Sequence, residues 1–210
     1  MSIDKDKIIQ SIIESSRVRD SKGILPSFGV YFSFFFVQYY TSLAFQFKKS
    51  IAEQGDAGQK SLVRLAQHSS YQTFHRICSS WEWKEVVEPE IESKEDQVHG
   101  LVAVNMALGW GALEIRSLIP DRELIVRVSD SSEANGYLKE FGRANAPQCH
   151  MLQGAMGAIM DLLYARAYPK GCYSFATSER ACRAQGDPYC EFVSWRQNEA
   201  EDAQKTRVSQ

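Results

Sequence analysis

Residues 178–192 of this chain read Ser-Glu-Arg-Ala-Cys-Arg-Ala-Gln-Gly-Asp-Pro-Tyr-Cys-Glu-Phe, which sets the Glu179 carboxylate and the thiols of Cys182 and Cys190 around a turn. The run Gly186-Asp187-Pro188 is strong turn-forming sequence, so the chain can fold back and bring Cys190 beside Cys182. Zinc takes four thiolate, imidazole or carboxylate ligands in a tetrahedron, and short spacings let one small knuckle supply several of them. The stretch therefore predicts a zinc site to which Glu179, Cys182 and Cys190 contribute.

The fourth ligand of this predicted site must come from outside the stretch. Cys149 is the first choice, and Cys172 and His150 are the alternatives that the sequence leaves open.

Ordinary buried cysteines and a disulfide are competing interpretations of the same thiols. The chain has five cysteines, and free cysteine is among the most frequently buried residue types. Residues 1–7 lack the basic and apolar regions of a secretory signal, so we expect a cytoplasmic protein whose thiols stay reduced. In that setting a cysteine cluster indicates metal binding before it indicates a bridge between Cys182 and Cys190.

The segment from Glu179 to Phe192 resembles the signature of the 4-vinyl reductase domain family. That family includes the aromatic-sensing domains of phenol- and xylene-responsive transcriptional regulators, and it is related in fold to vesicle-tethering TRAPP subunits. The likeness spans about residues 109–192. It continues upstream in three short runs, at Leu108-Gly-Trp-Gly111, Ser131-Ser-Glu-Ala134 and Cys149-His-Met-Leu-Gln-Gly154.

The resemblance implies a small α+β domain with a structural zinc held by three cysteines and one glutamate. Carried over by position, these ligands are Cys149, Glu179, Cys182 and Cys190. Cys149 lies further from Glu179 than in the aromatic sensors, which implies an insertion around residues 167–172. Cys172 therefore stays a competitor for the fourth position.

The resemblance also implies a cavity for a hydrophobic or aromatic small molecule. In the phenol sensors a tryptophan helps to hold the phenol hydroxyl, and Val128 stands at that position here. Valine cannot donate a hydrogen bond, so simple phenol is a poor fit. His99 lies near the place of the sensors' phenol-binding histidine. The predicted ligand-binding residues are His99, Trp110, Val126, Val128, Gln153 and Thr177.

The charge and hydropathy of the chain argue against two kinds of partner, nucleic acid and the membrane interior. The net charge is −2, so no basic field favours direct binding to nucleic acid. Residues 28–47 are uncharged and long enough to cross a bilayer, but they contain several hydroxyl and amide side chains, which are unfavourable in lipid. We therefore expect a buried aromatic helix and no membrane span.

Hydrophobic periodicity predicts a helical part over residues 1–90, a mixed zinc-containing part over 91–197 that forms one compact unit with it, and a disordered tail over 198–210. An exposed linker at residues 85–96 is expected to join the two parts. The spacing predicts helices over 4–19, 27–54, 59–79, 131–141 and 148–167, and strands over 110–118, 123–128, 173–177 and 189–195. The fold class is therefore α+β, with N-terminal helices packed on a small antiparallel sheet and a zinc knuckle near the C-terminus.

Two functions from different classes follow. The first is a ligand-binding or sensing module with Zn²⁺ as a structural ion, acting through a homodimer or a partner. The second is a small zinc-dependent hydrolase in which Glu179 serves as a general base toward a zinc-bound water. Three thiolates weaken the Lewis acidity of zinc, which favours the first.

Overall fold

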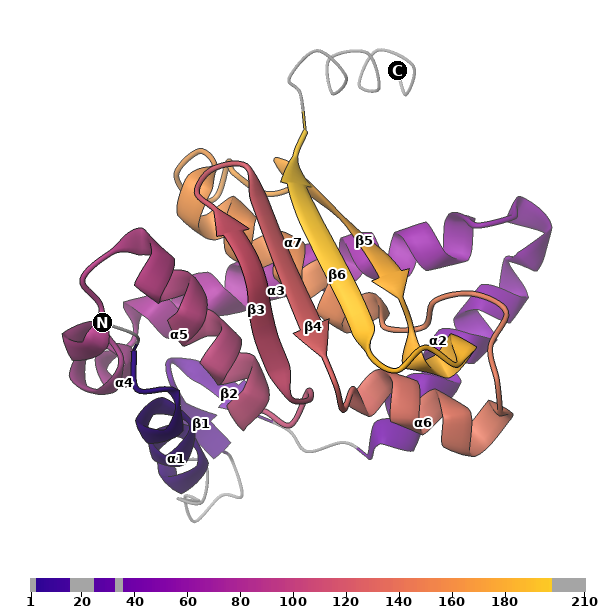
Figure 1. Cartoon of the computed structure of the whole chain (residues 1–210), viewed down its shortest axis with the longest axis horizontal. Coiled ribbons are helices and arrows are strands. Elements are labelled where there is room, and N and C mark those ends of the chain that lie inside the picture. Colours follow the sequence, from indigo (N-terminus) through magenta and orange to yellow (C-terminus); the bar gives the residue numbers. More distant parts are fainter. Residues whose placement is uncertain (1–2, 16–24, 33–35, 198–210) are drawn as a thin grey trace.

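The computed structural model describes residues 3–15, 25–32 and 36–197. Within them, a four-stranded antiparallel sheet carries helices α3 (Ala57–Ser79) and α7 (His150–Tyr164) on one face, and its other face has no helix over it (Figure 1). The fold class is α+β, as the sequence predicts.

The sheet has the spatial order β3-β4-β6-β5, so β5 forms a free edge. Its strands are β3 (Leu113–Ile119), β4 (Glu123–Val128), β5 (Phe175–Ala181) and β6 (Cys190–Arg196). The bounds of β4 are those predicted. The predicted strand at 110–118 begins later, at Leu113, and the strand predicted to end at Thr177 continues to Ala181.

Alternation along β4 explains how the sheet faces the core. Leu124, Val126 and Val128 are fully buried beneath the helices. Arg127 lies on the opposite face, where it pairs with Glu191 of β6 at 2.6 Å. Successive side chains of a strand point to opposite faces, so this strand is apolar on one side and charged on the other.

Helices α3 and α7 pack tightly against each other because α7 carries glycines at the contact. A Cβ atom at Gly154 would lie 2.5 Å from the Cβ of Ala66 and 2.5 Å from the backbone nitrogen of Gln67. At Gly157 a Cβ atom would lie 2.9 Å from both Gln67 Nε2 and Thr177 Oγ1. The small residues of this helix thus permit close approach to α3 as well as to the sheet.

A second group of elements covers the β3 side of the molecule (Figure 1). Helix α1 (Lys5–Ser15) packs on α5 (Lys94–Ala107), which begins at a capping box formed by Ser93 and Asp96. Between α3 and α5 lie α4 (Trp81–Val86) and the short turn η2 (Glu88–Glu90), so the predicted linker at 85–96 contains regular structure.

The predicted helix over 27–54 is wrong at its start. Residues 25–32 form a hairpin of β1 (Leu25–Ser27) and β2 (Val30–Phe32), and the helix α2 covers only Val37–Ser50. The turn has Phe28 and Gly29 at positive φ, and the backbone nitrogen of Phe28 donates to Glu82 of α4 at 3.0 Å. A contact with a residue 54 positions away stabilises this turn, which helical spacing alone cannot reveal.

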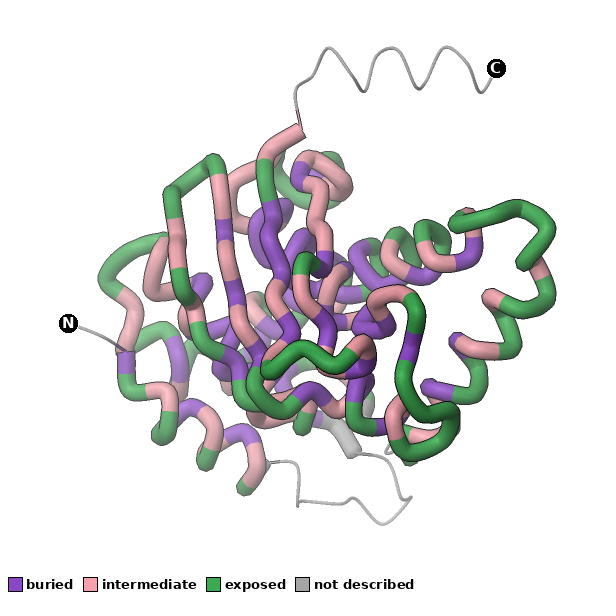
Figure 2. The backbone as a smooth tube through the Cα atoms, turned by 45° about the vertical axis from the view of Figure 1, so that its right-hand side comes forward, coloured by how far each residue is buried: buried purple, intermediate pink, exposed green. Residues whose placement is uncertain are grey.

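The aromatic face of α2 is also placed differently from the prediction. Phe36 is 84% exposed, Tyr39 57%, Leu43 53% and Phe47 38%. The helix instead buries Thr41 and Ala44, on the side that packs against α6 (Ser132–Phe141). Figure 2 shows the exposed segments along the arm that α2 and the start of α3 form at one side of the molecule.

None of the described helices is both long and apolar enough to span a bilayer. The predicted tail at 198–210 lies outside the described residues, as do residues 16–19 of the first predicted helix. The division into parts 1–90 and 91–197 stays a prediction.

Candidate metal centre

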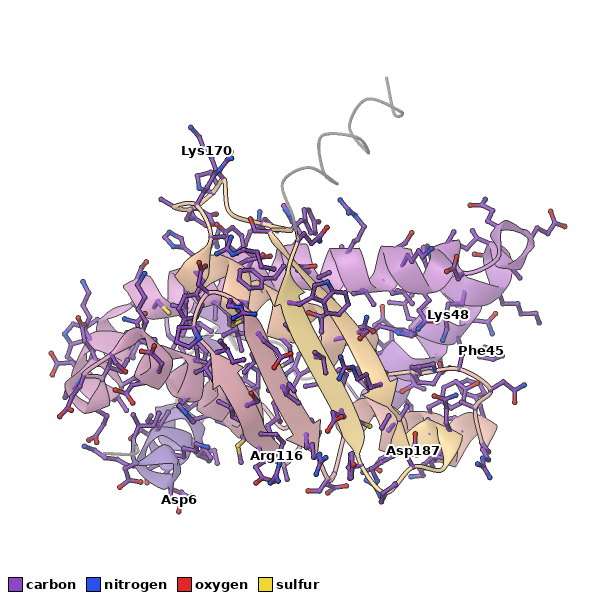
Figure 3. The ribbon with its side chains drawn as sticks, turned by 45° about the horizontal axis from the view of Figure 1, so that its top comes forward. Asp6, Phe45, Lys48, Arg116, Lys170 and Asp187 are labelled. Carbon is purple, nitrogen blue, oxygen red and sulfur yellow. The ribbon has the colours of Figure 1, made fainter. Side chains whose placement is uncertain are left out.

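Four predicted metal ligands meet where four elements begin or end. Cys149 directly precedes α7, and Glu179 lies on β5. Cys182 lies between β5 and the short turn η3 (Arg183–Gln185), and Cys190 is the first residue of β6. Asp187, in the turn between these strands, lies at the opposite end of the sheet from Lys170 (Figure 3).

The ligand atoms have the spacing of a tetrahedral site. The three Sγ atoms and one carboxylate oxygen of Glu179 all lie within 4.8 Å of one another. The Sγ atoms of Cys149 and Cys190 are 3.6 Å apart. Ligands bound to zinc at about 2.3 Å in a tetrahedron are about 3.8 Å from one another. The cluster can therefore hold a metal ion with little movement of its side chains.

The turn between β5 and β6 is shaped by short-range hydrogen bonds. The backbone nitrogen of Cys182 donates to Asp187 Oδ2 at 2.8 Å, and the backbone nitrogen of Asp187 donates to the carbonyl of Cys182 at 3.3 Å. Gly186 has φ +100, a conformation that favours glycine. The backbone nitrogen of Arg183 donates to Cys190 Sγ at 3.3 Å, an interaction that stabilises a thiolate at that position.

One atom of the cluster has no partner within the described residues. Glu179 Oε2 accepts a hydrogen bond from the backbone nitrogen of Cys149 at 3.0 Å, whereas Glu179 Oε1 is buried and accepts none. A buried unsatisfied carboxylate oxygen is costly. A metal ion bonded to this oxygen would remove that cost, so the donor set fits a bound cation.

The pKa values of the cluster also reflect crowded acidic groups. Burial raises the pKa of the Glu179 carboxyl to about 9. Hydrogen bonding to Cys182 and to Cys190 raises the pKa of the Cys149 thiol well above its usual range. Hydrogen bonding to Cys149 and to Cys190 holds the pKa of Cys182 well below its usual range. The positive charge of a bound divalent cation would lower the pKa values of the four donors and so favour the ionised form of each.

A partly buried lysine, Lys48, lies next to the cluster. Three thiolates and one carboxylate around a divalent ion leave two negative charges in excess, which a nearby cation would stabilise. Lys48 Nζ lies 3.0 Å from His150 Nε2 and donates to Gln148 Oε1. Burial lowers the pKa of Lys48, and the charges of Glu133, Cys182 and Glu179 act in the opposite direction.

Glu133 holds the start of α7, and with it Cys149, in place. The sequence places Glu133 at the start of the predicted helix over 131–141. That helix, α6, is capped by Ser131, whose Oγ accepts a hydrogen bond from the backbone nitrogen of Ala134 at 3.3 Å. The Glu133 carboxylate, however, accepts from the backbone nitrogens of Met151 and Leu152 at 3.0 and 2.9 Å. A carboxylate at a helix N-terminus satisfies free N–H groups and interacts favourably with the helix dipole.

The structure brings Cys149 to the cluster and leaves the alternatives outside it. Cys172 lies in the segment between α7 and β5, where burial raises its pKa to about 12. The side chain of His150 is directed to Lys48. The donor group found among the described residues contains neither of them.

The predicted ligand-binding residues fall into two sets. Val126 and Val128 are fully buried in the core, His99 lies partly buried on α5, and Trp110 packs at the edge of the same core. Gln153 and Thr177 instead line an open cavity of about 400 Å³ at the free edge of β5. The lining of that cavity includes none of the other four residues.

No protein-family model and no curated protein sequence matches this chain. Several solved structures resemble it, among them these two. The phenol-responsive sensory domain of the transcription activator PoxR, crystallised with phenol, has a TM-score of 0.73 at 14% identity and covers 98% of each chain. A trafficking protein particle complex subunit 3 from Naegleria fowleri, covalently bound to palmitic acid, has a TM-score of 0.52 at 11% identity. That match covers 77% of this chain and 95% of the other. At these identities the likeness shows a shared fold.

Proposed function

We propose that this protein is a small-molecule-sensing domain with a structural zinc ion. The observation that carries the proposal is the likeness in fold to a phenol-responsive sensory domain over 98% of both chains. The zinc assignment rests on the cluster of Cys149, Glu179, Cys182 and Cys190, whose soft, closely spaced donors suit Zn²⁺ better than Mg²⁺ or Ca²⁺.

The proposed role of zinc is to fasten the start of α7 to β5 and β6. Four protein donors converge on one point and leave no position for water, which is the arrangement of a structural site. The hydrolase alternative needs an open position with a bound water. A crystal structure of the zinc-loaded protein separates the two: a Glu179 oxygen as the fourth ligand supports the structural role, and a water molecule in that position supports hydrolysis.

The proposed ligand is a hydrophobic or aromatic molecule. Of the six residues predicted from the sequence, its proposed contacts are Gln153 and Thr177, which line one cavity; His99, Trp110, Val126 and Val128 lie apart from that cavity. We also propose a cytoplasmic homodimer, with the ligand state passed on through the dimer or to a partner. Calorimetric titration with a panel of substituted phenols, alkylbenzenes and fatty acids tests the binding function. Saturable binding with a negative heat-capacity change is the expected result, since apolar surface is buried. The absence of binding across the panel would refute it.

A further inference from the structure

The cavity at the free edge of β5 has the features of a built ligand site. It has a volume of about 400 Å³, within the range of small-molecule pockets. Its walls come from α3, the start of α7 and β5, three elements that pack against one another. Helix α3 runs beyond the sheet on this side (Figure 1), so the cavity opens between an arm of the molecule and a strand edge.

Two glutamine side chains at the cavity are held in one orientation by the strand edge. Gln67 Nε2 donates to the carbonyl of Phe175 at 2.8 Å and to Asp161 Oδ2 at 2.7 Å. Gln153 Nε2 donates to the carbonyl of Thr177 at 2.5 Å. Rotating either amide by half a turn would set an oxygen against these acceptors, so the positions of the amide oxygens are determined.

The hydrogen bonds to Asp161 and to the edge of β5 satisfy the side-chain nitrogens of Gln67 and Gln153, but they leave the side-chain oxygens without a donor. Gln67 is only 6% exposed; its Oε1 accepts no hydrogen bond from the described residues, but this oxygen is not fully enclosed. Gln153 Oε1, in contrast, is buried and has no partner within the described residues. Two neighbouring acceptors on α3 and α7 therefore stand without donors at one cavity. A buried acceptor is normally satisfied, so Gln153 Oε1 indicates a bound group that donates hydrogen bonds, and Gln67 provides a second acceptor in the same cavity lining.

The mouth of the cavity carries a cation with no acidic partner. The Arg64 guanidinium lies over the ring of Tyr173, 4.2 Å from its centroid, and no carboxylate of the described residues pairs with it. Lys60, also at the mouth, already pairs with Asp56 at 2.9 Å. Stacking on an aromatic face leaves the N–H edges of a guanidinium free to bind an oxyanion with two parallel hydrogen bonds.

Tyr173, which forms one wall, is held in a strained backbone conformation. Its φ is +70, which is unusual for a residue with a bulky side chain. Its backbone nitrogen donates to Asp161 Oδ2 at 2.8 Å, its hydroxyl donates to the carbonyl of Arg64 at 3.2 Å, and its carbonyl accepts from Gln197 at 3.3 Å. Strain maintained by several contacts is typical of functional sites, and here it fixes the surface on which Arg64 stacks.

We infer that this cavity binds a small hydroxylated aromatic carboxylate. Its carboxylate pairs with Arg64 at the mouth, and its hydroxyl donates to the amide oxygens of Gln67 and Gln153 at the floor. Val63 and Ala176, which also line the cavity, provide apolar contacts for the ring. The inference rests on the proposed sensing function and adds to it the chemical class of the ligand and the residues that select it.

Calorimetric titration with three acids of increasing length tests the inference: 4-hydroxybenzoate, 4-hydroxyphenylacetate and 3-(4-hydroxyphenyl)propionate. At least one should bind with saturation. Its matched analogue without the hydroxyl, and phenol without the carboxylate, should each bind at least about tenfold more weakly, because each leaves a buried or charged partner unsatisfied. Failure of all three acids to bind would overturn the inference.

Variants separate this site from any other ligand site of the molecule. Arg64→Met should weaken binding of the best acid by about tenfold or more while the fold is kept, since Arg64 is exposed. Arg76→Met, the same change at an exposed position of the same helix, should have no effect. Gln67→Met should abolish the preference for the hydroxyl, provided that its unfolding curve stays cooperative; Gln153→Met gives a second measurement of the same preference.

The outcomes distinguish this inference from the proposed function. If neutral aromatic compounds bind and none of the three acids does, the sensing function stands and the assignment of this cavity is wrong. If neither acids nor neutral compounds bind, both are wrong. If the acids bind equally well to Arg64→Met and to the natural protein, the carboxylate does not contact Arg64 and the inference fails.

Discussion

Different local features of the chain position the residues of the candidate metal cluster. The turn at Gly186 sets the spacing between Cys182 and Cys190, the β5 strand presents Glu179, and the Glu133 carboxylate anchors the helix that follows Cys149. Three of the four donors thus come from one contiguous stretch, and the fourth depends on how a helix packs on the sheet.

Replacing individual cysteines tests the composition of the site. We expect Cys149→Ser and Cys190→Ser to lower zinc content from about one ion per chain to well below one. We also expect the free energy of unfolding to fall by more than about 3 kcal/mol, because zinc contributes about 10 kcal/mol or more to the folding of small zinc domains. Cys172→Ser is the matched control and should keep the metal. Elemental analysis and denaturant unfolding measure both effects; zinc loss in Cys172→Ser would reassign the fourth ligand.

Asp161 is a second residue on which the arrangement of β5 depends. It is fully buried and accepts hydrogen bonds from the backbone nitrogens of Tyr173 and Phe175 and from Gln67. Asparagine has one acceptor oxygen in place of two, so Asp161→Asn should destabilise the protein by about 1–3 kcal/mol at neutral pH.

The pH dependence of this difference has a definite sign. Burial raises the pKa of Asp161 to about 6 in the folded protein, above its value of about 3.8 in the unfolded chain. Between these values the folded state retains a proton that the unfolded state has lost. The contribution of Asp161 to stability therefore falls as pH rises from about 4 to about 6. Urea unfolding at several pH values should show the natural protein losing stability relative to Asp161→Asn in this window; a difference that grows with pH would contradict the expectation.

Among the elements, α7 and α3 form the contact that joins the N-terminal helices to the sheet. We expect Gly154→Ala to destabilise the protein by about 1–3 kcal/mol or more, because the added Cβ meets the Cβ of Ala66 and the backbone of Gln67 at 2.5 Å. Gly100→Ala on α5 is the control. Its Cβ would meet the Val87 side chain at 3.0 Å, and it also gains helix propensity. Thermal unfolding of the two variants should rank them in this order; equal stability would show that the helices can separate without cost.

The elements also show which sequence patterns are informative. The hairpin of β3 and β4 was predicted closely because alternating apolar residues on both sides of Pro120 are a local signal. No local pattern predicts the hairpin at 25–32, because its turn is stabilised by Glu82, far away in the sequence. In α2 the three- and four-residue spacing of the apolar residues predicts a helix, but spacing does not tell which face meets protein.

At the scale of the whole molecule, the exposed apolar face of α2 is the surface most suited to self-association. Contiguous apolar patches are uncommon on monomers. We expect the protein to form a homodimer, and Leu43→Glu to convert it to a monomer. Leu65→Glu, on α3 at a position 65% exposed, is the matched control and should leave the dimer intact. Sedimentation velocity over a range of concentrations measures the outcome, and a monomeric natural protein at every concentration would refute the prediction.

The sequence by itself determined the α+β class, the knuckle of Glu179, Cys182 and Cys190, and the strand Glu123–Val128, because each depends on residues that are neighbours along the chain. Only the tertiary structure decided that Cys149 rather than Cys172 joins the cluster, that the aromatic face of α2 meets solvent, and that Gln67 and Arg64 share a cavity with Gln153. Those outcomes depend on which segments meet across long separations in sequence. The packing of α3 and α7 on the sheet sets these long-range contacts, and no local sequence pattern encodes them.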